Sequence, residues 1–185
     1  LTDLPAQKDF PYSLAKITGI KLCDFYRQQY GDNFFSVVPC AFFGENSSFD
    51  LQRASVVAAL IKRFHDAKVT GAKELVLWGS GKPIKEFLHS DDIANACVFL
   101  MQHYEDGGLV NIGSGDGGHT IMETAQIIRK VVGFTGEITC DLSKPDGIMR
   151  RVMDSSKLKS LGWMPQYTLE EALTNMYAYF LRENM

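Results

Sequence analysis

The stretch PYSLAKITGIKLCDFYRQQYGDNFFSVVP, from Pro11 to Pro39, indicates a helix followed by a buried strand. Apolar side chains recur at intervals of three and four between Tyr12 and Tyr30, which is the helical period. Gly31-Asp32-Asn33 then stops the helix. Phe34 to Val38 is a short apolar run with β-branched residues, typical of a strand inside a parallel sheet, and Pro39 ends it.

Helices and strands alternate along the rest of the chain, which predicts the α/β class. Thr120 and Glu123 form the pattern of a capping box, and Ser90-Asp91-Asp92 offers a second helix cap. We expect the carboxy-terminal part of a Rossmann-type parallel sheet, with a smaller mixed α/β region that binds a substrate. Further helices are predicted at about 55–68, 90–104, 120–132, 155–161 and 169–182, and further strands at about 74–78, 86–89, 109–112 and 137–141.

Composition narrows the possible partners. The 185 residues include 45% hydrophobic ones, enough for a real core, and the formal net charge of −3 argues against nucleic acid. No stretch approaches the roughly 20 apolar residues of a membrane helix, and no signal pattern opens the chain, so we expect a cytoplasmic protein without a membrane partner. The four cysteines are far apart and lack histidines at ligand spacing, so no metal site is predicted.

One motif is missing from the beginning of the chain. An α/β enzyme that binds a dinucleotide usually opens with a strand, a glycine-rich turn and a helix, which seat the pyrophosphate. The glycines at Gly79 to Gly81 and at Gly113 to Gly118 come late and are predicted to be turns. If this is a dinucleotide enzyme, we therefore expect its first half to lie outside this chain.

Tyr12 and Lys16 are the predicted chemical centre. A spacing of four places the phenol and the ammonium on the same helical face, one turn apart. The lysine cation stabilises the phenolate, so this phenol can give its proton to a carbonyl oxygen while hydride arrives at the carbon. Chance often produces this spacing, so its interpretation depends on the segments that follow.

Several segments carry a resemblance that spans almost the whole chain. They are PYSLAKITGIKLC (11–23), SVVP (36–39), ALIKRFHDAK (59–68), LWGSGKPIKEFLHSDDIA (77–94), VNIGSG (110–115) and SKPDG (143–147). In this order and spacing they resemble the extended short-chain dehydrogenase/reductase family, which acts mainly on nucleotide sugars. Within it they are most similar to the GDP-L-fucose synthase subfamily.

The resemblance implies a role for individual residues. Tyr12 would donate a proton to the keto oxygen, and Lys16 would hold the nicotinamide ribose of NADP(H). The other implied cofactor-binding residues are Pro39, Cys40, Ala41, Phe42 and Ser55. The implied substrate-binding residues, which would meet a GDP-sugar, are Arg63, Trp78, Lys85 and Asp146.

Three of these residues have a simpler interpretation. Arg63 lies on a helix beside Lys62 and His65 and could belong to a solvated face. Trp78 could be ordinary core, and Asp146 is a good turn residue whether or not a ligand is present.

The sequence also departs from the subfamily pattern. Ser55 stands where the epimerising members have a histidine, and serine cannot exchange a proton near neutral pH without a strong neighbouring base. The cysteine that these members also use would lie upstream of Leu1. Lys85 stands where the family usually has arginine. The lysine ammonium is a point charge and cannot bind a phosphate in the bidentate way that an arginine guanidinium does.

The predicted function is NADPH-dependent reduction of a GDP-4-keto-6-deoxy sugar, with weak or no epimerase activity. A bifunctional GDP-L-fucose synthase, an NAD-dependent nucleotide-sugar epimerase or dehydratase, and a non-catalytic substrate-domain fragment stay open as alternatives. We expect residues 1–54 to end the dinucleotide-binding domain, and 55–185 to bind the sugar nucleotide, with about 77–112 returning to the sheet. The resemblance further implies a homodimer through the first helix, to which Ile17, Ile20 and Phe25 could contribute unless they face the chain's own core.

Overall fold

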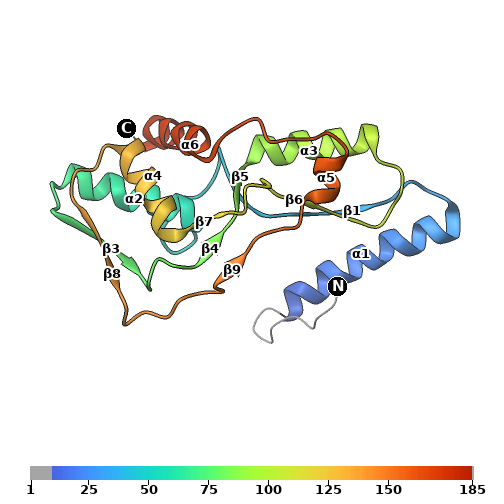
Figure 1. The fold of residues 1–185 in the computed structure, drawn as a ribbon, viewed down its shortest axis with the longest axis horizontal. Coiled ribbons are helices and arrows are strands. Elements are labelled where there is room, and N and C mark those ends of the chain that lie inside the picture. Colours follow the sequence, from blue (N-terminus) through green and yellow to red (C-terminus); the bar gives the residue numbers. More distant parts are fainter. Residues whose placement is uncertain (1–9, 185) are drawn as a thin grey trace.

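The computed structural model describes residues 10–184 of the chain (Figure 1). Short strands in several small sheets are interleaved with helices, as the α/β prediction requires. The helices are α1 (Phe10–Tyr30), α2 (Val56–Val69), α3 (Ser90–His103), α4 (Ile121–Val132), α5 (Ser156–Ser160) and α6 (Leu169–Asn184). The strands are β1 (Ser36–Pro39), β2 (Ala41–Phe43), β3 (Glu74–Trp78), β4 (Ile84–Lys85), β5 (Phe87–His89), β6 (Leu109–Ile112), β7 (His119–Thr120), β8 (Glu137–Asp141) and β9 (Arg150–Arg151).

Most strand pairs are parallel. β1 pairs with β6, β2 with β5, and β3 with β8, each in parallel orientation. β4 is the centre of a three-stranded sheet, with β9 parallel on one side and β7 antiparallel on the other. Parallel partners need long crossover connections, which is why the helices lie between them in the sequence.

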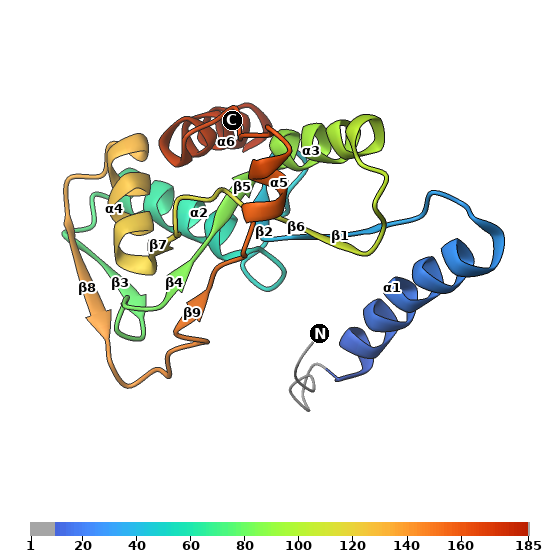
Figure 2. The ribbon, with the colours of Figure 1, turned by 45° about the vertical axis from the view of Figure 1, so that its right-hand side comes forward.

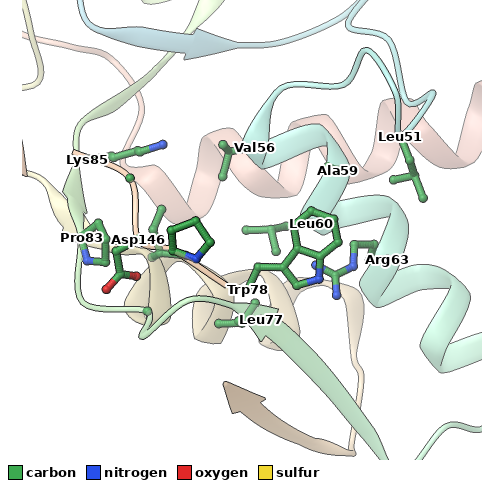
Figure 3. Close-up of a pocket in the computed structure, with 14 residues that line it drawn as sticks. Leu51, Val56, Ala59, Leu60, Arg63, Leu77, Trp78, Pro83, Lys85 and Asp146 are labelled. Carbon is green, nitrogen blue, oxygen red and sulfur yellow. The ribbon is translucent and has the colours of Figure 1, made fainter. Parts of the chain in front are cut away.

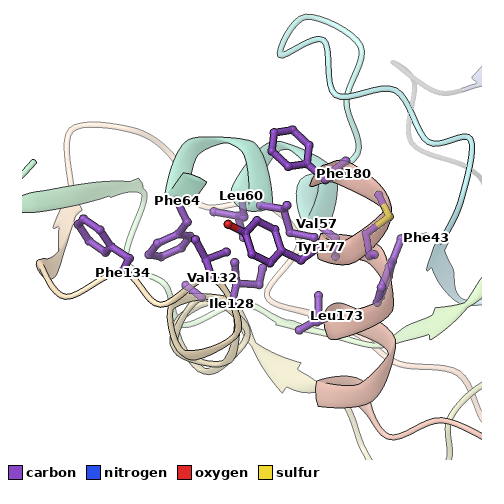
Figure 4. Packing of buried hydrophobic residues seen from close by; sticks show 14 of the residues in the cluster. Phe43, Val57, Leu60, Phe64, Ile128, Val132, Phe134, Leu173, Tyr177 and Phe180 are labelled. Carbon is purple, nitrogen blue, oxygen red and sulfur yellow. The ribbon is translucent and has the colours of Figure 1, made fainter. Parts of the chain in front are cut away.

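The larger of two hydrophobic cores lies between α2, α4, α6 and the β3–β8 pair (Figure 4). Phe64 of α2 is fully buried, and its ring meets that of Phe134 edge-on with the centroids 5.7 Å apart. This core supports the strand end and the helix face from which the first cavity described below is built. Its other buried members include Val57, Leu60, Ile61, Leu75, Leu77, Ile128, Val132, Leu173, Met176 and Phe180.

A second core lies where α3 and α5 cover one side of the β1–β6 pair (Figures 1 and 2). The indole N–H of Trp163 donates to the Asn95 side-chain oxygen at 2.8 Å, which satisfies the one polar group that this large side chain brings inside. The predicted domain division at residue 54, with about 77–112 returning to the sheet, stays a prediction. β6 pairs with β1, and residues of α3 share this core with them. The other buried members are Cys40, Leu88, Ala96, Leu100, Tyr104, Val110, Ile112 and Leu158.

Helix α1 stands apart from both cores (Figure 2). None of its residues is buried. The Arg27 guanidinium donates to the Asn33 side chain at 2.7 Å and to the Glu105 carbonyl, and so ties the end of α1 to the loop after α3. Several apolar side chains of α1 are exposed, including Leu14, Leu22 and Phe25.

The helices and longer strands predicted from the sequence are present, with three corrections. The strand predicted at 34–38 begins at Ser36 and includes Pro39. The Ser36 and Cys40 N–H groups donate to the Gly108 and Ile112 carbonyls on the side of β6. Backbone nitrogens alternate in direction along a strand, so the Pro39 nitrogen points away from β6, and proline is tolerated there because no hydrogen bond is lost. The cap of α3 is His89, whose Nδ1 accepts from the Asp91 N–H, rather than Ser90-Asp91-Asp92. The two- and three-residue strands β2, β4, β7 and β9 were not predicted.

We expect the Phe64→Ala substitution to lower the free energy of unfolding by about 3–5 kcal/mol, because it leaves a cavity in the larger core. The matched control is Val69→Ala at the end of the same helix, where the side chain is 72% exposed and the expected change is within about 0.5 kcal/mol. Urea denaturation of the two variants measures both values. Similar losses in the two variants would contradict this packing.

Candidate active site

The four predicted substrate-binding residues surround a single cavity of about 380 Å³ (Figure 3). Arg63 comes from α2, Trp78 ends β3, Lys85 belongs to β4, and Asp146 lies in the loop between β8 and β9. The fold thus brings together residues that are far apart in the chain. The remaining wall is mostly apolar and is formed by Leu51, Val56, Ala59, Leu60, Leu77, Gly81, Pro83, Ile121, Pro145 and Gly147.

Trp78 is not a core residue, because its side chain is 71% exposed at the edge of this first cavity. Figure 3 shows the indole in front of Leu60 and beside Arg63. The Lys144 ammonium lies 6.0 Å from the ring centre, within cation–π range. The indole is therefore available as a flat wall for a planar group.

Arg63 is half-buried rather than part of a solvated face. Its guanidinium donates to the Val76 carbonyl, which anchors the side chain against β3. Burial lowers the pKa of Arg63 from its ordinary value. A guanidinium has five N–H donors, so the bond to Val76 leaves others for a ligand in the cavity that Arg63 lines.

Asp146 connects the loop between β8 and β9 to the turn after β3. Its Oδ1 accepts from the Ser80 N–H at 2.8 Å and its Oδ2 from the Ser80 hydroxyl at 2.7 Å. These two hydrogen bonds lower the pKa of the carboxyl. A Cβ on Gly79, whose φ is +80°, would lie 2.4 Å from Oδ1, so glycine permits this close approach. Asp146 is therefore a turn anchor as well as a cavity residue.

A second cavity, of about 280 Å³, adjoins the first. Val56 and Lys85 line both cavities, so the two spaces meet at these side chains. Apart from Tyr12 and Lys16, the residues predicted to bind the cofactor line the second one, namely Pro39, Cys40, Ala41, Phe42 and Ser55. A ligand in each cavity would meet the other near Lys85.

Ser55 is the N-cap of α2, where its hydroxyl oxygen accepts from the Ala58 N–H at 3.4 Å. Within residues 10–184, no imidazole or carboxylate is hydrogen-bonded to this hydroxyl. It therefore lacks the strong base that it would need to exchange a proton with a substrate.

Cys40 is buried at the wall of the second cavity. Burial, reinforced by the nearby Glu86 carboxylate, raises the pKa of the thiol to about 12. Cys40 is therefore a neutral thiol at physiological pH and a poor nucleophile.

Sequence reasoning missed two charged residues at the second cavity, Glu86 and Arg151. Glu86 is buried and accepts hydrogen bonds from the Ser114 hydroxyl and from the backbone N–H groups of Gly115 and Met153. Its position inside the strand predicted at 86–89, directly before the apolar Phe87 and Leu88, was the available signal for Glu86. Arg151 gave no comparable signal, because β9 is too short to show a period.

Tyr12 and Lys16 share one face of α1, as their spacing predicts. The Lys16 ammonium lies 5.5 Å from the centre of the Tyr12 ring. Tyr12 is 70% exposed, and neither residue lines the first or the second cavity. The structure therefore brings the pair together but does not place it beside the two cavities.

These features define an α/β protein with two adjoining cavities of about 380 and 280 Å³, and comparison with known proteins gives its family. The NAD dependent epimerase/dehydratase family matches residues 1–113, and the chain belongs to this family.

Several similar proteins are named as GDP-sugar enzymes. GDP-L-fucose synthase 1 of Arabidopsis thaliana is 48% identical over 171 residues, covering 92% of this chain and 53% of the relative. Among solved structures, the NADP-bound GDP-L-fucose synthetase from Naegleria fowleri is similar with a TM-score of 0.88 and 28% identity, over 97% of this chain and 58% of that one. The GDP-6-OMe-4-keto-L-xylo-heptose reductase of C. jejuni is similar with a TM-score of 0.87 and 30% identity, over 96% of this chain and 62% of that one.

The chain spans about half the length of the curated relatives it matches. These similarities confirm the predicted resemblance to GDP-L-fucose synthases and the predicted fold class.

In the part of the chain that the structure describes, no helix is long and apolar enough to cross a membrane. No group of three His, Cys, Asp or Glu side chains suited to a metal ion occurs among the same residues.

We expect Cys40 to resist alkylation by iodoacetamide from about pH 7 to about pH 9 in the folded chain. A thiol with a raised pKa stays protonated over this range, so its reaction accelerates only as the pH approaches its pKa of about 12. Unfolding in urea should remove the protection. Mass spectrometry of the modified peptide measures the rate, and Cys40→Ala identifies its signal. Rapid modification of the folded chain near neutral pH would contradict the burial.

Proposed function

We propose that this chain carries the sugar-nucleotide site and the proton-donating tyrosine of an NADPH-dependent reductase that acts on a GDP-4-keto-6-deoxy sugar. The observation that carries the proposal is the convergence of Arg63, Trp78, Lys85 and Asp146 on one cavity. That cavity meets a second one, lined by residues 39–42, at Lys85. The names of the relatives support the same substrate class.

The first cavity suits a GDP-sugar. Its apolar wall and the exposed Trp78 fit the flat base, while the Arg63 and Lys85 cations fit the diphosphate. Asp146 is placed to accept hydrogen bonds from the nucleotide end through the lone pairs that Ser80 leaves free.

The second cavity suits the nicotinamide end of NADP(H). Pro39 to Phe42 would form its wall, and Ser55 would lie at its edge. The bound cofactor would supply the hydride for the carbonyl carbon. The neutral thiol of Cys40 would not compete with this step as a nucleophile.

Tyr12 would protonate the keto oxygen, and Lys16 would bind the nicotinamide ribose and stabilise the phenolate. This requires α1 to be held with Tyr12 beside the second cavity. A homodimer through the exposed side of α1, with Ile17, Ile20 and Phe25 at the contact, is part of the proposal. Residues 1–54 would then complete a dinucleotide-binding domain, and the enzyme would act in the cytoplasm.

We expect Tyr12→Phe to lower kcat for NADPH oxidation with GDP-4-keto-6-deoxymannose by about 10²- to 10⁴-fold, because the proton donor is lost. The assay uses the protein that carries this chain. The matched control is Tyr26→Phe on the same helix, which should retain its rate. A Tyr12→Phe variant with unchanged kcat would exclude the proposed role.

We further expect no deuterium at sugar positions 3 and 5 when the reaction runs in D₂O, because the Ser55 hydroxyl caps α2 and has no strong base beside it. Product analysis by NMR measures the label. Label at either position would show that the protein is bifunctional. A tightly held NAD in the purified protein would instead favour an epimerase or dehydratase.

A further inference from the structure

A third cavity, of about 340 Å³, lies between β5, the loop after β6 and the start of α6. Among the described residues, Phe87 is the one that it shares with the second cavity, and it shares none with the first. The Ser114 hydroxyl on its wall donates at 2.9 Å to Glu86, which lines the second cavity. Phe87 and this hydrogen bond therefore stand between the two spaces, and a ligand in the third cavity would occupy a site of its own.

His89 offers this cavity a hydrogen-bond donor. Its side chain is 4% exposed, and its Nδ1 accepts from the Asp91 N–H at 3.3 Å, with the Asp91 carboxylate 3.5 Å from the same nitrogen. A ring nitrogen that accepts carries no hydrogen, so the hydrogen of this imidazole is on Nε2. Within residues 10–184, Nε2 has no hydrogen-bond partner, and it is not sealed away, because Asp92 Oδ2 is the one fully buried side-chain atom there that lacks a partner. Since His89 lines the third cavity, its Nε2–H is available to a ligand in it.

Asp116 offers a hydrogen-bond acceptor to the same cavity. Its Oδ1 accepts from the Gly118 N–H at 2.7 Å and lies 2.6 Å from the Ser114 hydroxyl oxygen. Its Oδ2 accepts no hydrogen bond from the described residues, and His119 Nδ1, at 3.8 Å, is beyond hydrogen-bond range. The cavity therefore presents one unused carboxylate oxygen and one unused imidazole N–H.

The charges around the cavity disfavour an anionic ligand. No lysine or arginine is among the described residues that line it, and Asp116 adds a negative charge. The start of α6 is not free to bind an anion, because the Thr168 N–H and hydroxyl both donate to the Glu171 carboxylate at 2.8 Å. A wholly apolar ligand is disfavoured as well, since it would leave the His89 N–H buried without a partner.

The rest of the wall is largely apolar. The half-buried Tyr167 ring lies with its centre 5.1 Å from the centre of the His89 ring, so the donor and the aromatic surface are neighbours. Phe87, Leu169 and Ala172 continue this wall. The face of an aromatic ring carries partial negative charge and packs well against a flat array of C–H groups. A matching ligand therefore has one apolar face and neutral groups at its edge that both donate and accept.

We propose that the third cavity binds a neutral pyranose sugar. A pyranose has hydroxyl groups around a ring whose C–H groups form an apolar face. One hydroxyl accepts from His89 Nε2, a second donates to Asp116 Oδ2, and the C–H face packs against Tyr167. This chemistry is the same for a free sugar and for the end of a glycan. The site does not depend on the proposed reductase activity.

The test is a titration of the protein that carries this chain with D-mannose, D-galactose and L-fucose, and with the methyl glycoside of each. Saturation-transfer NMR follows the sugar signals, and GDP is present in excess to occupy the first cavity. We expect at least one sugar to bind with a Kd on the order of 1 mM. Binding of the methyl glycoside as well identifies the end of a glycan, whereas binding of the free sugar alone identifies a monosaccharide.

Two variants remove one partner each and keep the local structure. His89→Asn retains an acceptor that caps α3 and removes the Nε2–H donor, and Asp116→Asn retains the acceptor for Gly118. We expect each to weaken sugar binding by about tenfold. The matched controls are His103→Asn and Asp106→Asn, two exposed residues that do not line the third cavity and should match the parent protein. Circular dichroism checks the fold, and if His89→Asn unfolds, Asp116→Asn decides alone.

Four results would overturn the proposal. They are the absence of binding by every sugar, displacement of the sugar by GDP, parent-like affinity in both variants, and an equal loss in either control. Inorganic phosphate is titrated in parallel, and its displacement of a bound sugar would show an anion site instead. None of these results bears on the proposed reductase function, which the Tyr12→Phe assay tests separately.

Discussion

The buried carboxylate of Glu86 is the interaction on which the arrangement of the two cavities depends. Removing a charge from water is costly unless hydrogen bonds replace the lost solvation. Here the Ser114 hydroxyl and the N–H groups of Gly115 and Met153 do so at 2.8–3.2 Å. The carboxylate thereby joins three segments, one before β5, one after β6 and one after β9. A Cβ on Gly113 would lie 2.7 Å from Glu86 Oε1, so the approach also depends on that glycine.

Two neighbouring residues of one short segment have different environments. Lys85 lines both cavities, whereas Glu86 is buried at the wall of the second one and is held there by its hydrogen bonds. The same segment therefore contributes a cation that lines both cavities and, beside it, a buried carboxylate that anchors the segment. Asp146 joins the loop between β8 and β9 to the turn at Ser80 in a similar way, so the far wall of the first cavity is also fixed by a carboxylate.

The helices and longer strands could be predicted because each is long enough to show its apolar period. The capping box at Thr120 is a local signal of the same kind and was found from the sequence. Strands such as β9 contain two residues and are defined by their partners, so Arg151 could not be placed in advance. The residues of the two cavities that the sequence analysis named came from the family resemblance rather than from any pattern. The exposure of Tyr12 could not be foreseen, because periodicity shows which residues share a face but not what covers it.

Pro39 has a consequence for the rim of the second cavity. β1 gives its Ser36 and Cys40 donors to β6, so any strand lying along its opposite edge would find a nitrogen without hydrogen at Pro39. Such a ladder would stop there, within the wall of the second cavity that residues 38–42 form. The missing donor thus limits strand pairing along this edge of the backbone, beside the wall of the second cavity.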